Sequence, residues 1–201
     1  MKNLKTLIAS FLVLTALNST AQAGVFDLAS FLETKKWSVG FEPEVAISNG
    51  TGLGLNFKPK YGVNDMINVQ GLFGPGTGRR QGRVGLLVDF EWFPDYENQP
   101  GIATAAFTEY YDLEDGGILK LGAKPMIYKT FHGQGAIYTP FVSVPIGWNN
   151  QSGSVEGFVQ IVLGSMITLP STDRWKFSAE AGFDAKNAYS YLSGGVTYLA
   201  P

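Results

Sequence analysis

The sequence predicts an all-β protein, an up-and-down antiparallel β-barrel of about ten strands, from three observations. Apolar and polar residues alternate along most of the chain after about Lys36, which is the pattern of strands with two different faces. Turn residues separate these alternating runs, and the runs have no helical periodicity of useful length. The 201 residues include 25 Gly and no Cys, so the sheet itself must hold the domain together, without disulfides or thiolate metal ligands.

Residues 1–23 are expected to form a secretory signal peptide. Lys2 and Lys5 precede the apolar run TLIASFLVLTAL, and an A-x-A cleavage site follows at residues 21–23. Residues 24–35 are then either a short N-terminal helix, with Asp27 capping its first turn, or a leader. The barrel domain is expected to cover residues 36–201. No later run is long enough for a membrane helix, so any crossing would use strands.

Alternating runs of strand length fill the predicted barrel domain. In chain order they cover residues 37–48, 52–61, 67–73, 83–93, 102–111, 118–128, 137–148, 155–167, 174–184 and 191–199. In the first run, Trp37, Val39 and Phe41 share one face, while the residues between them occupy the other. An even number of antiparallel strands leaves both ends of the domain on the same side of a closed barrel.

The aromatic residues predict that the apolar face points outward, into a membrane. Alternation alone fits both a soluble barrel with an apolar core and a membrane barrel with an apolar outer band. If the chain starts in the periplasm, aromatic residues of the apolar face gather near the periplasmic boundary, as a girdle at the headgroup level does. These residues are Trp37, Tyr61, Trp92, Tyr138, Trp175 and Tyr198. The predicted fold class is therefore a transmembrane β-barrel.

This pattern resembles the small outer-membrane β-barrel proteins of Gram-negative bacteria. A signal peptide is followed by paired amphipathic strands, joined by turns such as YGVND (residues 61–65) and PSTDR (residues 170–174). The resemblance covers nearly the whole chain after residue 23 and implies a porin-like membrane protein in the cell outer membrane, inserted by the barrel assembly machinery. It transfers no functional residue. Such proteins usually end in an aromatic residue, whereas this chain ends at Pro201, so Tyr198 would have to serve from three residues inside.

The polar face of the strands is expected to line the lumen with a nearly balanced set of charges. Buried charges are costly unless they are paired, and a barrel of this size leaves little room beyond that filled by its own side chains. A salt-bridged plug is therefore the favoured hypothesis. A narrow hydrated channel is the competing one, although a conducting pore more naturally carries an excess of one sign. The charged residues are Glu42, Glu44, Lys58, Lys60, Asp89, Glu91, Glu109, Lys120, Lys124, Lys176 and Glu180.

Strand pairing predicts which of these charges meet. A three-residue loop at residues 49–51 would place Glu42 opposite Lys58. A five-residue loop would instead place Glu44 opposite Lys58 and Glu42 opposite Lys60. An acid meets a base in either register, which favours cross-strand ion pairs.

Sites with recognisable chemistry are few. His132, the only histidine, is expected in a periplasmic turn, away from the acid or serine that a hydrolase would need and without nearby metal ligands. The glycines of residues 73–82 precede neither a helix nor a Lys-Ser/Thr pair, so a flexible loop is favoured over a phosphate-binding loop. Asp112, Glu114 and Asp115 are expected to be solvated rather than bound to calcium.

Three arginines are candidates for contact with lipopolysaccharide. Arg79, Arg80 and Arg83 are expected at the outer rim, where guanidinium groups suit phosphate. Solvated loop charges are the simpler interpretation.

The predicted function is that of an outer-membrane barrel protein with a structural or narrow-pore role. No enzymatic activity, cofactor or nucleic-acid partner is expected, and the expected partners are outer-membrane lipid and the assembly machinery. The alternatives are a soluble periplasmic barrel that binds an apolar ligand and, less favoured, an outer-membrane hydrolase. The predicted topology places Asn49 and residues 76–80, 112–116, 149–154 and 186–187 at the cell exterior.

Overall fold

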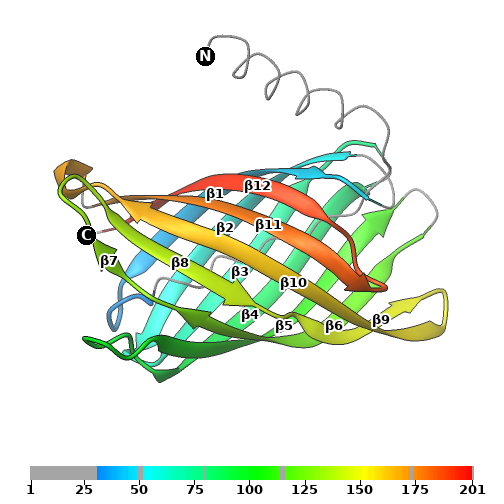
Figure 1. Cartoon of the computed structure of the whole chain (residues 1–201). Helices are drawn as coiled ribbons and strands as arrows, with labels where there is room; N and C mark the ends of the chain where they lie inside the picture. The colour runs from blue at the N-terminus through cyan, green and yellow to red at the C-terminus, as the bar shows by residue number, and fades with distance from the viewer. Residues whose placement is uncertain (1–30, 49–51, 79, 114–115, 173, 201) are drawn as a thin grey trace, which may run out of the picture.

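The computed structural model describes residues 31–48, 52–78, 80–113, 116–172 and 174–200, which form a closed β-barrel (Figure 1). Among these residues, no helix is long and apolar enough to cross a membrane. A 3₁₀ turn, η1 (Pro170–Thr172), precedes β11. The strands are β1 (Trp37–Ala46), β2 (Gly52–Asn64), β3 (Ile67–Pro75), β4 (Arg80–Phe93), β5 (Gly101–Leu113), β6 (Ile118–Tyr128), β7 (Phe131–His132), β8 (Ile137–Ser143), β9 (Ile146–Gln151), β10 (Ser154–Thr168), β11 (Trp175–Lys186) and β12 (Tyr191–Leu199).

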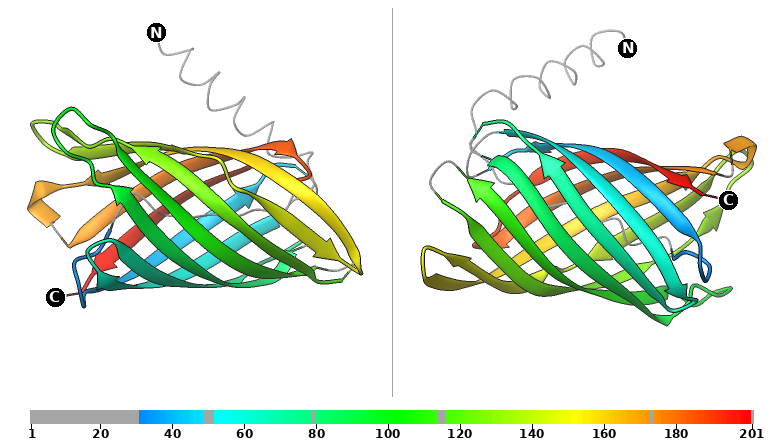
Figure 2. Two further views of the ribbon diagram at one scale, coloured as in Figure 1. Left: turned by 90° about the horizontal axis from the view of Figure 1, so that it is seen from below. Right: turned by 180° about the vertical axis from the view of Figure 1, so that it is seen from behind.

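These segments make a barrel of ten antiparallel strands, as predicted. Both β8 and β9 pair with β6 on one side and with β10 on the other, so they are two parts of one barrel strand. The break between them falls at Val144 and Pro145, because proline has no N–H to give to a ladder. Pairing of β1 with β12 closes the sheet, and the further views in Figure 2 show tilted strands on all sides.

The seam between the first and last strands has a local gap. Paired positions run from Ser38–Leu199 to Phe41–Val196 and resume at Glu44–Ser193, which leaves Glu42 and Pro43 outside the β1–β12 ladder. The ladder between β1 and β2 is continuous past the same residues. Pro43 lacks an N–H, so the missing backbone bond falls on the side of β12.

The two ends of the barrel differ in their connections. At the terminal end, where β1 begins and β12 ends, the connections include residues 94–100, 129–136 and 169–174. At the far end, where β1 ends at Ala46, β9 and β10 are joined by Ser152 and Gly153 alone. Both of these residues have positive φ, 51° and 87°, as the type I′ hairpin turn requires. The C-terminus marks the terminal end in Figure 1.

The register between β1 and β2 differs from both predicted registers. Ser38 pairs with Lys60 and Ala46 with Gly52, so Glu42 lies opposite Asn56 and Lys58 lies opposite Gly40. The prediction was wrong because β1 ends early. Its pairing with β2 stops at Ala46, whereas the next N–H, that of Ile47, still donates on the β12 side, to the Ser190 carbonyl at 2.8 Å.

The segment before β1 folds back against the inner face of the barrel wall, at the terminal end. Lys35, with φ 66°, forms a turn with Thr34, and the N–H of Lys35 donates to the Gly62 carbonyl at 2.7 Å. Leu32 is buried, and its N–H lies 3.4 Å from Asn68 Oδ1. Residues 24–30 lie outside the described part of the chain, so the predicted N-terminal helix remains untested, as does the signal peptide.

Candidate functional site

The side chains predicted to line the lumen point into the barrel. Burial alternates along the strands, for example residue by residue through β1 and β5. Glu91 and Lys176 are half-buried near the ends of their strands. The buried members of the predicted set are Glu42, Glu44, Lys58, Lys60, Asp89, Glu109, Lys120, Lys124 and Glu180.

Two ion pairs connect β1 and β4 to the lysines of β2. Lys58 pairs with Glu42, although the observed register places these residues diagonally rather than opposite each other. The contact is possible because Gly40, which does lie opposite Lys58, has no side chain to block it. Lys60 Nζ lies 3.3 Å from Asp89 Oδ2, and this pair spans the intervening strand β3.

Arg83 is the centre of an interaction that spans the barrel interior. Its Nη2 lies 2.8 Å from Glu109 Oε1 on β5, and its Nη1 lies 3.4 Å from Glu44 Oε2 on β1. Asn56 Nδ2 donates to the same Glu44 oxygen at 2.9 Å. Since β2 and β3 separate β1 from β4, the Arg83 side chain reaches across the interior rather than along the wall.

Tyrosines continue this network toward the far end. Tyr111 OH donates to Glu109 Oε2 at 2.6 Å and lies 3.1 Å from Tyr189 OH. Tyr189 precedes β12 and is buried. Tyr191 OH donates to Glu180 on the neighbouring β11. Five buried side chains, from Glu44 through Arg83, Glu109 and Tyr111 to Tyr189, therefore form a continuous polar chain.

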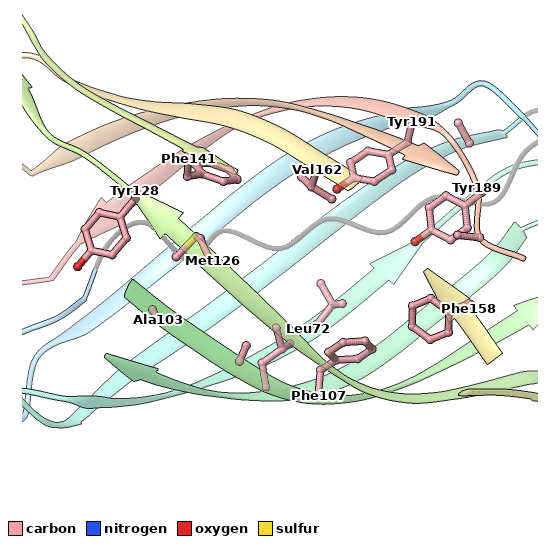
Figure 3. Packing of buried hydrophobic residues seen from close by; sticks show 14 residues of the cluster. Leu72, Ala103, Phe107, Met126, Tyr128, Phe141, Phe158, Val162, Tyr189 and Tyr191 are labelled. Atoms are coloured by element: carbon pink, nitrogen blue, oxygen red, sulfur yellow. The ribbon is translucent and has the colours of Figure 1, made fainter. Parts of the chain in front are cut away.

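Another part of the interior is apolar, which the sequence pattern did not predict. Leu72, Phe107, Phe141, Phe158 and Val162 belong to a buried cluster on β3, β5, β8 and β10 (Figure 3). Phe107 and Phe158 have ring centroids 6.2 Å apart. These residues occupy inward positions that could equally have carried polar groups, and they leave correspondingly less room for water.

The six predicted girdle aromatics lie on the outer face, near the ends of strands at the terminal end of the barrel. Trp37, Trp92, Tyr138 and Trp175 are exposed, while Tyr61 and Tyr198 are half-buried. Contacts occur between Trp37 and Tyr61 and between Trp175 and Tyr198, with ring centroids 4.6 Å and 5.0 Å apart. Large apolar side chains, including Phe41, Leu121 and Ile161, are exposed along the wall beyond them.

Sequence reasoning missed exposed aromatics toward the other end. Trp148 is 60% exposed and Tyr110 is 45% exposed, both within a few residues of far-end hairpins. Strand periodicity could have placed them on the outer face, because Trp148 lies two residues from outward Ile146 and Tyr110 lies two residues from outward Thr108. Apolar side chains thus extend over the outer face between two aromatic levels.

The predicted placement of Arg83 at the rim was wrong. Its side chain is buried in the interior and cannot contact lipid phosphates. Arg83 lies an even number of residues from Asp89 on β4, so strand periodicity would have placed both on the inward face. Arg79 lies outside the described residues, and the structure describes only the backbone of Arg80, so their contact with lipopolysaccharide stays a prediction.

The remaining candidates gather no metal-binding or catalytic cluster. His132 is exposed on β7. Within the described part of the chain, no three His, Cys, Asp or Glu side chains could hold a metal ion. Glu114 and Asp115 lie outside that part, so calcium binding is not tested there.

An ion pair outside the barrel strands ties together two terminal-end connections. Lys129 Nζ lies 2.5 Å from Asp95 Oδ1, and the Thr130 N–H donates to Asp95 Oδ2 at 2.6 Å. Lys129 also donates to the Glu97 and Gln99 carbonyls, at 2.5 Å and 3.2 Å. Partial burial acts to raise the pKa of Asp95, but the hydrogen bonds from Lys129 and Thr130 outweigh it and lower the pKa.

The fold is similar to those of solved outer-membrane barrels, although no family model and no curated protein matches the chain. An outer membrane channel from Pseudomonas putida F1 has 8% identity and a TM-score of 0.51, covering 89% of this chain and 100% of that one. The KdgM porin has 15% identity and a TM-score of 0.42, covering 80% and 98%. Ail of Yersinia pestis has 13% identity and a TM-score of 0.33, covering 84% and 100%. The chain has the fold of an outer-membrane β-barrel.

Proposed function

We propose that the protein is an outer-membrane barrel with a structural role, whose lumen is closed by interlocked side chains and passes at most water or small ions. The observation that carries this proposal is the bridge from Glu44 through Arg83 to Glu109, which joins β1 to β4 and β5, two strands that are not its neighbours. The Lys60–Asp89 pair spans a strand in the same way. Side chains that cross the interior occupy the space that a pore would need.

Pairing also explains how the barrel tolerates so many buried charges. An unpaired ion in a low-dielectric interior costs several kcal/mol, whereas a well-hydrogen-bonded pair recovers much of that cost. A water-filled channel would not need such pairing, because water would solvate each group separately. The same arrangement gives no excess of one sign to select permeating ions.

Planar-bilayer recording of the refolded protein tests the closed lumen. The expected result is the absence of steady conductance on the nanosiemens scale. A steady open level of that size in the unmodified protein would establish the narrow hydrated channel instead.

A double-mutant cycle tests whether the charges act as pairs. Glu42→Gln and Lys58→Met should each destabilise the barrel, and the double variant should cost less than their sum, with a coupling of about 0.5–3 kcal/mol. The free energy of unfolding from denaturant titration in detergent provides the measurement. Strictly additive losses would mean that these side chains do not depend on each other.

We further propose that residues 1–23 direct export, that the protein resides in the cell outer membrane, and that the assembly machinery inserts it among outer-membrane lipids. The exposed apolar side chains of the outer face support lipid contact and oppose a soluble barrel. We propose no enzymatic role, since His132 lies exposed on β7, away from the interior.

The orientation in the membrane is part of this proposal. An N-terminus exported into the periplasm places the far end outside the cell. The connection lengths favour the opposite orientation, because outer-membrane barrels usually have their longer connections outside and the longer connections of this barrel lie at the terminal end. Labelling of introduced cysteines on whole cells with an impermeant thiol reagent decides between the two orientations. Reaction at Ser152→Cys but not at Ser171→Cys supports the proposed topology, and the reverse inverts it.

A further inference from the structure

The far end of the barrel contains an open polar cup. Its volume is about 490 Å³, within the range of small-molecule sites. The cup lies between β6, β9, β10 and the connection before β12, and Asn149, Gln151, Ser154 and Asn187 line it. These side chains are neutral hydrogen-bonding groups, unlike the charges in the middle of the barrel.

The wall of the cup is held in place by its own hydrogen bonds. Asn149 Nδ2 donates to the Asn187 carbonyl at 3.0 Å, and Asn187 Nδ2 donates to the Gly157 carbonyl at 3.2 Å. The tight turn at Ser152 and Gly153 fixes the hairpin of β9 and β10 beside them. A ligand would therefore meet amides that are already ordered, which lowers the entropic cost of binding.

Lys120 and three aromatic rings close the floor of the cup. Lys120 Nζ lies 4.3 Å from the ring centroid of Tyr189, 4.8 Å from that of Tyr111 and 5.4 Å from that of Phe158. Such contacts stabilise the ammonium where it is. Beneath them the neighbouring cavity has a volume of only about 10 Å³, roughly one water molecule. The cup is consequently suited to binding a ligand rather than to admitting solutes into a channel.

We propose that this cup binds a neutral saccharide unit. Amide and hydroxyl side chains both donate and accept hydrogen bonds, which suits a ligand covered in hydroxyl groups. The ammonium of Lys120 already lies against three rings, and Glu156 brings an acid to the lining, so the cup has no excess of positive charge to favour an anion. This binding role is independent of whether the lumen conducts.

Saturation-transfer NMR on the refolded protein tests the proposal, with maltose and cellobiose as neutral probes and glucuronate as the charged one. The detergent must have no sugar headgroup. Maltose or cellobiose should bind weakly, and the double substitution Asn149→Leu with Gln151→Met should weaken that binding by about tenfold or more by removing its hydrogen-bond partners.

Asn150→Leu is the matched control, because Asn150 lies between the two substituted residues on β9 but is exposed on the other face. Its binding should equal that of the unmodified protein, and heat-modifiable migration on gels should show that all variants fold. The proposal fails if neither neutral probe binds, if only glucuronate binds, or if the control loses binding as much as the double variant.

Discussion

The inward faces of two strand pairs differ in chemistry although they line the same lumen. On β1 and β2 the buried inward residues include Glu42, Glu44, Lys58 and Lys60. On β8 and β10 the corresponding positions include Phe141, Phe158, Val162 and Met166. One wall is thus charged and the other is largely apolar. The interior is therefore packed by two mechanisms, ion pairing on one side and apolar contact on the other.

Removing Arg83 should cause the largest loss of stability, because it breaks the ion pairs of the charged wall. Arg83→Ala would leave Glu44 and Glu109 buried without their shared cation, which costs about 3–5 kcal/mol. Denaturant titration of the refolded protein measures the change in the free energy of unfolding. Arg174→Ala, at an exposed arginine, is the control and should change stability by less than about 0.5 kcal/mol. Equal effects at both positions would mean that water fills the space around Arg83.

Truncation on the apolar side should cost a similar amount for a different reason. Phe141 packs so closely over Gly164 that a Cβ there would collide with its ring. Phe141→Ala would leave a cavity and cost about 3–5 kcal/mol. A cost below about 1 kcal/mol would show that the interior near β8 is already hydrated.

The outer face allows a second contrast, between positions at different depths in the membrane. Phe41 lies midway along β1 and is 47% exposed, whereas Trp37 begins the strand. Phe41→Arg should cost about 2–4 kcal/mol, and Trp37→Arg much less, because the cost of a charge facing lipid falls toward the interfaces. Refolding titrations in lipid vesicles measure both. Equal small costs would mean that this face never meets lipid.

The smallest effect is expected from the ion pair outside the strands, between Asp95 and Lys129. The pKa of Asp95 in the folded protein is lower than its ordinary value of 3.8, so its stabilising contribution is complete above that value. It is lost as the pH falls through the lower folded pKa. The protection of the Thr130 amide, its exchange rate relative to that of an unstructured amide at the same pH, should therefore fall in acid below about pH 4, because its N–H donates to Asp95. Asp95→Asn should remove this pH dependence, and persistence of it in the variant would contradict the assignment.

The sequence predicted the charged wall well and the apolar wall poorly, for a physical reason. On β1 and β2 the period of two separates polar from apolar residues, so inward and outward positions can be told apart. On β8 and β10 both faces carry apolar residues, such as outward Val142 beside inward Phe141, and alternation is lost. The burial of Tyr189 could not be predicted from the sequence either, because Tyr189 lies in a connection, which has no strand periodicity to show which way a side chain points. The register prediction failed because pairing with β2 stops at Ala46, while the Ile47 N–H continues the β1–β12 side by donating to the Ser190 carbonyl.

The interrupted seam at Pro43 bears on how the barrel forms. Closure joins β1 to β12, strands at opposite ends of the domain in sequence, so the chain entropy that opposes this contact is the largest of any strand pair. We therefore expect the first and last strands to pair late in folding, after the hairpins between neighbouring strands have formed. A ladder that skips Glu42 and Pro43 has fewer bonds to close in that final step. We expect the same junction to part first when the barrel unfolds, so that a single proline helps to determine how long the closed state persists.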